Sequence, residues 1–63
     1  MIKDMRKQKG YTQKQLANFA GVTVRSIAAY EAGERRPSIG VAYKIAAVLD
    51  IPEDQILKVF YKK

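Results

Sequence analysis

The sequence predicts a small all-α domain of five helices. Apolar residues recur at intervals of three and four, the spacing of one helix face, and no stretch alternates as a half-buried strand would. Ser or Thr stands before three of the apolar stripes and Gly follows three of them, as is typical of helix ends. We expect one domain over residues 1–63, with helices at about 1–9, 12–20, 23–32, 38–50 and 52–59.

The first two helices are marked by their ends. Gly10 stands where a left-handed residue closes a helix without a steric penalty. Thr12 and Gln15 form a capping box at the start of the second helix, and Gly21 ends it. The residues expected to face the core are Ile2, Met5, Arg6, Leu16, Phe19 and Ala20.

The last three helices have similar signals. Thr23 and Ser38 are good N-cap residues for the third and fourth helices, and Gly33 ends the third. Pro52 suits the first turn of a fifth helix, where nearby acidic residues match the positive end of its dipole. The expected core residues are Ile27, Tyr30, Ala42, Ile45, Ala46, Leu49, Ile56, Leu57 and Phe60.

Composition limits the possible functions. The chain has no Cys and no His, which removes disulfides and thiolate or imidazole chemistry, and we expect neither an enzyme nor a cofactor. Residues 1–36 carry eight Lys or Arg and three acidic residues, whereas residues 37–63 carry four and three. A basic half suggests a polyanionic partner, although it could also be only a soluble surface. No apolar run approaches a membrane span and no signal peptide is evident, so a cytoplasmic protein is expected.

The stretch from Gln13 to Glu31 has the pattern of a helix-turn-helix. Ala17 is small enough for a close helix crossing, Gly21 can take a positive φ at the turn, and Ile27 can anchor the second helix. The start of that helix would then project outward and fit a groove about 12 Å wide. This arrangement predicts binding of double-stranded DNA through its major groove.

These residues resemble a known family. Residues 2–57 are similar to the Cro/repressor-type (Xre-type) helix-turn-helix domain, which implies a compact lambda-repressor-like fold and a sequence-specific transcriptional regulator. Repression by operator occupancy is the expected mode. The matching pieces are Arg6, Tyr11 to Ala17, Gly21 to Thr23, Ile27, Glu31, Gly33, Pro37, Ser38, Lys44 to Ala46, Val48 and Leu49.

The resemblance also implies roles for individual residues. Gln13 matches a glutamine that contacts a DNA phosphate and buttresses the recognition helix, and Arg35 and Arg36 match a basic loop along the DNA backbone. Arg6 and Glu31 match an internal ion pair. The exposed start of the recognition helix corresponds to Thr23, Val24, Arg25, Ser26 and Ala29.

Each of these roles has a structural alternative. Arg25 could pair with guanine or be an ordinary solvated residue, and Gln13 could serve only as a good helix former. Arg35 and Arg36 could form a charged turn. Because Val24, Ala28 and Ala29 are apolar where relatives often carry polar residues, we expect sparse direct readout of bases and a larger role for DNA shape.

The partners expected are an inverted-repeat DNA site and a second copy of the chain. A single recognition helix binds modestly, which favours a homodimer. No small-molecule effector is expected, since we identify no second domain for sensing one. The alternative function is a helical module that binds protein, such as an antitoxin or an adaptor of the transcription machinery. The predicted dimer interface comprises Ile56, Val59, Phe60 and Tyr61, unless the apolar side of the fifth helix only completes the core.

Overall fold

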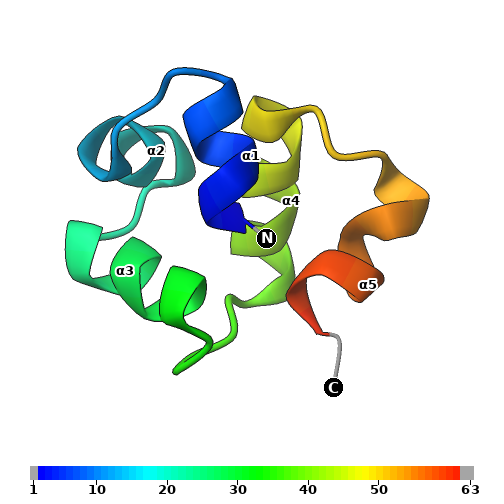
Figure 1. Ribbon diagram of the computed structural model, residues 1–63. Coiled ribbons are helices and arrows are strands. Elements are labelled where there is room, and N and C mark those ends of the chain that lie inside the picture. The colour runs from blue at the N-terminus through cyan, green and yellow to red at the C-terminus, as the bar shows by residue number, and fades with distance from the viewer. Residues whose placement is uncertain (1, 62–63) are drawn as a thin grey trace.

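The computed structural model describes residues 2–61, which form helices joined by short loops and contain no strand (Figure 1). This architecture confirms the predicted five-helix, all-α fold. Met1, at which the first helix was predicted to begin, lies outside the described residues. The elements are α1 (Ile2–Gln8), α2 (Gln13–Ala20), α3 (Val24–Ala32), α4 (Ile39–Leu49), the 3-10 helix η1 (Glu53–Gln55) and α5 (Ile56–Phe60).

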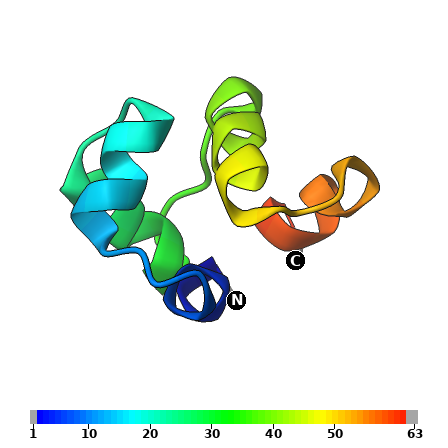
Figure 2. The same cartoon turned by 90° about the horizontal axis from the view of Figure 1, so that it is seen from above.

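The helices are arranged with α1 and α4 between two outer groups. The α2–α3 pair lies on one side of them and α5 on the other, in both views (Figures 1 and 2). Three side chains from α2, α3 and α4, namely Leu16, Ile27 and Ile45, are almost completely buried at the centre. The rest of the core is Ile2, Ala17, Ala20, Ala42, Ala46, Leu49, Ile51, Ile56 and Phe60. Packing of these short helices supplies the stability that no single one could have in isolation.

Side-chain caps begin α2, α3 and α4. The Thr12 hydroxyl accepts from the Gln15 N–H at 3.0 Å, while the Gln15 side chain accepts from the Thr12 N–H at 2.9 Å, which confirms the capping box. Thr23 and Ser38 are the N-caps of α3 and α4, as predicted. Each cap satisfies a backbone N–H that has no partner inside its helix.

Left-handed residues close α2 and α4. Gly21 has φ 71° and its N–H reaches back to carbonyls of the last turn of α2. Asp50 has φ 56° and is the only non-glycine residue with a positive φ within residues 2–61. Aspartate tolerates this conformation better than most residues, and the Asp50 carboxylate also pairs with Lys9. The ion pair thus joins the end of α4 to the segment that follows α1.

Two predicted core residues are exposed. Phe19 is 55% exposed, because α2 turns by about 100° per residue and buries the face that holds Leu16, Ala17 and Ala20. Phe19 falls at the margin of that face, where its ring packs edge-on against Tyr11 with the ring centroids 5.4 Å apart. Leu57 is 65% exposed and also lies outside the core.

The predicted fifth helix is divided into two parts. The Gln55 N–H bonds to the Pro52 carbonyl at 2.9 Å, so the first turn is a 3-10 turn and α-helical residues begin only at Ile56. The α-helical part of this region is therefore only five residues long.

None of the helices in residues 2–61 could span a bilayer, since the longest, α4, has eleven residues and a crossing needs about 20.

Candidate nucleic-acid interface

The helix-turn-helix is formed by α2 and α3 and the turn between them. Ala17 is buried on the inner side of α2, and the Val22 N–H bonds to its carbonyl at 3.0 Å as the chain reverses. Ile27 is 1% exposed and anchors the middle of α3, with Tyr30 half-buried one turn later. Because the anchors lie in the middle and end of α3, its first turn projects from the body of the protein.

The first turn of α3 carries the residues predicted to meet DNA bases. The Thr23 hydroxyl accepts from the Ser26 N–H at 3.1 Å and donates to the Ser26 hydroxyl at 3.0 Å. The two hydroxyls therefore lie together at the exposed start of α3. Val24 and Arg25 are exposed, whereas Ala29 is half-buried. Arg25 is thus the long polar side chain at this end of the helix.

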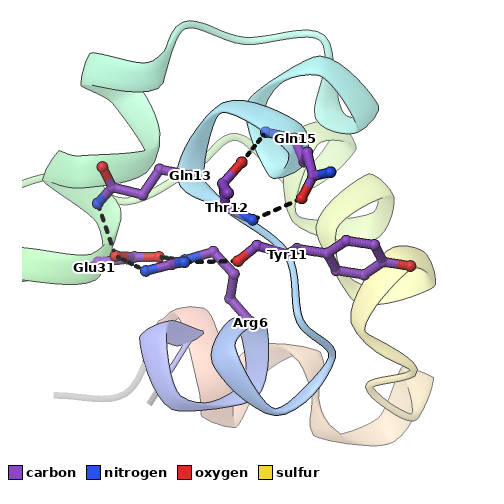
Figure 3. A network of polar contacts seen from close by, with 6 residues as sticks. All are labelled: Arg6, Tyr11, Thr12, Gln13, Gln15 and Glu31. Carbon is purple, nitrogen blue, oxygen red and sulfur yellow. Dashed lines mark hydrogen bonds and ion pairs between the residues drawn. The ribbon is translucent and has the colours of Figure 1, made fainter.

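A hydrogen-bonded network joins α1, the start of α2 and the last turn of α3 (Figure 3). Arg6 Nε donates to Glu31 Oε2 at 2.6 Å, and Arg6 Nη1 donates to the Tyr11 carbonyl at 2.8 Å. Gln13 Nε2 donates to Glu31 Oε1 at 3.0 Å. The structure therefore brings Arg6, Gln13 and Glu31 together, and the Gln13 amide is held at the start of α2 by a carboxylate of α3.

The charges of this network are almost completely buried. The side chains of Arg6 and Glu31 are 9% and 5% exposed. Burial alone would raise the pKa of Glu31, but the hydrogen bonds from Arg6 and Gln13, together with the charge of Arg6, lower it below its ordinary value. Glu31 is therefore ionised in the folded protein and accepts hydrogen bonds from both partners.

The stability of the fold is expected to fall in acid because of Glu31. A carboxyl whose pKa is lowered by folding contributes a stabilisation that is complete above its unfolded pKa, near 4.5, and is lost as the pH falls through the folded pKa. Urea unfolding at a series of pH values from about 7 to about 3 measures this loss. In the Glu31→Gln variant the corresponding part of the pH dependence should be absent, and an unchanged pH dependence would contradict the assignment.

The basic loop follows α3. The backbone N–H groups of Glu34 and Arg35 bond to the Ala29 carbonyl at 2.9 and 3.4 Å, and the side chains of Arg35 and Arg36 are exposed. The loop lies at the opposite end of α3 from Arg25, a distance of about 12–14 Å for nine residues. The two ion pairs formed by residues 2–61 are Arg6–Glu31 and Lys9–Asp50, so the loop arginines and Arg25 have no carboxylate partner there.

Two further residues lie near the site, although no sequence pattern clearly predicted them there. Lys44 of α4 lies beside the turn, with its Nζ 3.8 Å from where a Cβ on Gly21 would be. The Tyr61 hydroxyl donates to the Pro37 carbonyl at 2.6 Å and so reaches the basic loop from beyond α5. Both contacts depend on tertiary packing between segments that are far apart in the sequence.

The predicted dimer surface requires correction. Ile56 and Phe60 are 3% and 6% exposed and belong to the core, because they are four residues apart and share the inner face of α5. Val59 and Tyr61 are half-buried against the same core. The large apolar side chains that the monomer exposes near α5 are instead Ile39, Tyr43 and Leu57.

Comparison with known proteins agrees with the helix-turn-helix geometry described above. The chain matches the helix-turn-helix family over residues 2–56. It is 33% identical over 57 residues to the SPbeta prophage-derived HTH-type transcriptional regulator YonR of Bacillus subtilis, a match that covers 90% of this chain and 53% of YonR. It is 39% identical over 57 residues to the HTH-type transcriptional regulator YqaE of the same bacterium, with coverage of 90% and 49%. An HTH-type transcriptional regulator of Methanothermobacter thermautotrophicus is 43% identical over 49 residues, which are 78% of this chain and 71% of that protein.

The chain therefore spans about half the length of the two Bacillus relatives and most of the archaeal one. The family match extends from α1 into α5 and includes both helices of the motif, the left-handed turn and the buried Arg6–Glu31 pair. The chain belongs to the Cro/repressor-type (Xre-type) helix-turn-helix family of DNA-binding transcriptional regulators.

Proposed function

We propose that this chain is a sequence-specific repressor that acts by occupying an operator as a homodimer, with the start of α3 in the major groove. The observation that carries the proposal is the exposed, unpaired Arg25 on a helix whose opposite side is fixed by Ile27 and the Arg6–Glu31 pair. One side of α3 is packed against the protein and the other exposes an unpaired guanidinium. A helix of this kind can enter the major groove and form hydrogen bonds to a base edge.

The proposed contacts divide between bases and backbone. Arg25 is assigned to a base, because its guanidinium can donate two hydrogen bonds to guanine O6 and N7. Gln13 is assigned to a phosphate: one of its two amide N–H groups is used by Glu31, and the second remains for an outside oxygen. Arg35 and Arg36 are assigned to the sugar-phosphate backbone, with Arg36 able to enter a narrow minor groove.

The apolar residues on α3 shape the expected specificity. Val24 is exposed, and Ala28 and Ala29 are half-buried on the same helix. Such side chains can pack on thymine methyl groups but cannot donate hydrogen bonds to base edges. Thr23 and Ser26 add two hydroxyls, which are hydrogen-bonded to each other. We therefore expect few direct base contacts and a larger contribution from DNA shape.

The proposed dimer uses the exposed side of α5 and the start of α4. Ile39, Tyr43 and Leu57 line a hollow of about 600 Å³ that Glu53 and Asp54 also line. Two copies related by a two-fold axis would bury these apolar side chains against each other. Such a dimer would present two recognition helices to DNA, which is what binding to an inverted repeat requires.

The test of this function is selection of bound duplexes from a random DNA pool at two salt concentrations. An enriched inverted repeat whose binding persists at moderate salt supports an operator-binding dimer. Absence of enrichment, with an affinity that vanishes as salt rises, would show only nonspecific attraction to phosphates. The exposed apolar hollow would then make a protein-binding module the better interpretation.

Arg25→Ala is expected to weaken binding to the selected duplex by about 1–3 kcal/mol, or roughly 5–150-fold, with little effect on random DNA. The matched control is Lys7→Ala, which removes one exposed positive charge from α1, outside both the motif and the proposed dimer surface. Fluorescence anisotropy titrations on both duplexes measure the two effects. Equal losses on specific and random DNA would reassign Arg25 to a phosphate.

A further inference from the structure

We infer that Tyr61 is a positioning residue for the basic loop, fixing Arg36 for DNA through a hydrogen bond to the Pro37 carbonyl. The inference rests on the proposed function, in which Arg35 and Arg36 contact the DNA backbone. It adds a residue that follows α5 and is not among the proposed DNA contacts.

The hydrogen bond joins two distant parts of the chain. The Tyr61 hydroxyl donates to the Pro37 carbonyl at 2.6 Å across a separation of 24 residues. Pro37 is buried, although Arg36 and Ser38 on either side of it are exposed. The Tyr61 hydroxyl therefore bonds to a buried residue that is flanked by two exposed residues.

The rest of the loop is held by its own neighbouring helices. At its start, the N–H groups of Glu34 and Arg35 bond to the carbonyl of Ala29 in α3. At its end, the Ser38 carbonyl accepts from the Ala42 N–H of α4 at 2.8 Å. Only Arg36 and Pro37 lie between these two anchors. Within residues 2–61, the Tyr61 hydroxyl is the only side-chain group from another element that bonds to this loop.

Tyr61 is itself held by neighbouring groups. Its N–H bonds to the Leu57 carbonyl at 2.9 Å, its ring packs against the core, and the preceding residue, Phe60, is buried. These contacts place the hydroxyl at the Pro37 carbonyl. Because proline fixes its own φ, holding its carbonyl also restricts the peptide from which Arg36 projects.

The experiment compares Tyr61→Phe with a matched control, Tyr11→Phe. Tyr61→Phe keeps the ring packed against the core and removes only the hydroxyl, whereas Tyr11 is a half-buried tyrosine outside the loop and outside the proposed dimer surface. Amide hydrogen exchange of the free protein is measured at Glu34, Arg35 and Ala42, whose N–H groups are hydrogen-bonded at the two ends of the loop. We expect faster exchange at these amides in Tyr61→Phe, with core amides and the Tyr11→Phe protein unchanged. Loop exchange equal to that of the parent would overturn the inference whatever the protein does with DNA.

DNA binding supplies the second readout. Tyr61→Phe should bind the selected duplex about threefold to tenfold more weakly, as expected for loss of one ordering hydrogen bond. Arg36→Ala should then cost less in the Tyr61→Phe background than in the parent, because both changes act through one side chain. Purely additive losses would show that Tyr61 does not act through Arg36 and would overturn the inference. A parent that enriches no duplex would overturn the proposed function instead, and the loop positioning would be decided by exchange alone.

Discussion

Replacing Glu31 with alanine is expected to destabilise the protein by about 3–5 kcal/mol, because the change leaves the Arg6 guanidinium buried without its counter-charge. Arg6 would keep its bond to the Tyr11 carbonyl, but its Nε and the Gln13 amide would both lose their acceptor. A domain of 63 residues has a free energy of unfolding of roughly 3–9 kcal/mol. The loss is therefore comparable with the whole stability of the fold, and urea unfolding at neutral pH measures it.

The control for this prediction removes both charges together. In the double variant Arg6→Met and Glu31→Leu, no charge is stranded, so most of the lost stability should return. Gln13→Ala should cost only about 0.5–1.5 kcal/mol, since it removes one hydrogen bond at the edge of the network. A double variant as unstable as Glu31→Ala would contradict the stranded-charge explanation and indicate that packing of these side chains is what matters.

The same double variant separates folding from DNA binding. Once Glu31 is apolar, the Gln13 amide has no carboxylate to orient it at the start of α2. The variant should therefore fold yet bind the selected duplex more weakly than the parent. The buried pair thus has two consequences, since it locks three helices together and holds the phosphate-directed amide in place.

The helix ends could be predicted from the sequence because their signals are local. The capping box at Thr12 and the left-handed turn at Gly21 involve residues no more than four positions apart. Side-chain and backbone preferences over such short separations can be recognised without knowing the tertiary packing. The exposed start of α3 is similarly local, because it follows directly from the position of the N-cap and of the buried Ile27.

Burial on the shorter helices was less predictable. In α2, the spacing of Leu16, Phe19 and Ala20 is compatible with one face, but the small Ala17 lies on the inner side and moves Phe19 to the margin. Hydrophobicity alone favours burying the larger ring, whereas the close packing of α2 in the motif requires the smaller side chain there. Side-chain size at a helix crossing therefore outweighed hydrophobicity.

Long-range contacts of the site could not be derived from residue patterns at all. The Arg6–Glu31 pair spans 25 positions and was indicated only by the family resemblance. The bonds from Gln13 to Glu31 and from Tyr61 to Pro37 span 18 and 24 positions. Such contacts depend on how the helices pack in three dimensions, which no spacing within one helix encodes.

Phe60→Ala is expected to destabilise the monomer by about 3–5 kcal/mol, because it removes a buried ring and leaves a cavity where α5 meets the core. Leu57→Ala, three residues earlier on the same five-residue helix, should change the stability of the monomer by less than about 0.5 kcal/mol, since Leu57 is 65% exposed. Urea unfolding of both variants at low protein concentration measures this difference.

For self-association, the substitution at Leu57 should have the larger effect and the substitution at Phe60 the smaller one. Leu57→Ala removes the most exposed apolar side chain of the proposed dimer surface, so sedimentation at increasing concentration should show weaker association in a protein that is still fully folded. Phe60→Leu, which keeps most of the buried volume, should fold and associate nearly as the parent does. If Leu57→Ala associates like the parent while Phe60→Leu does not, the surface that self-associates is not the one exposed around Leu57. Because α5 lies across α1 and α4 from the recognition helix, Leu57→Ala should also weaken binding to an inverted repeat without weakening binding to a single half-site.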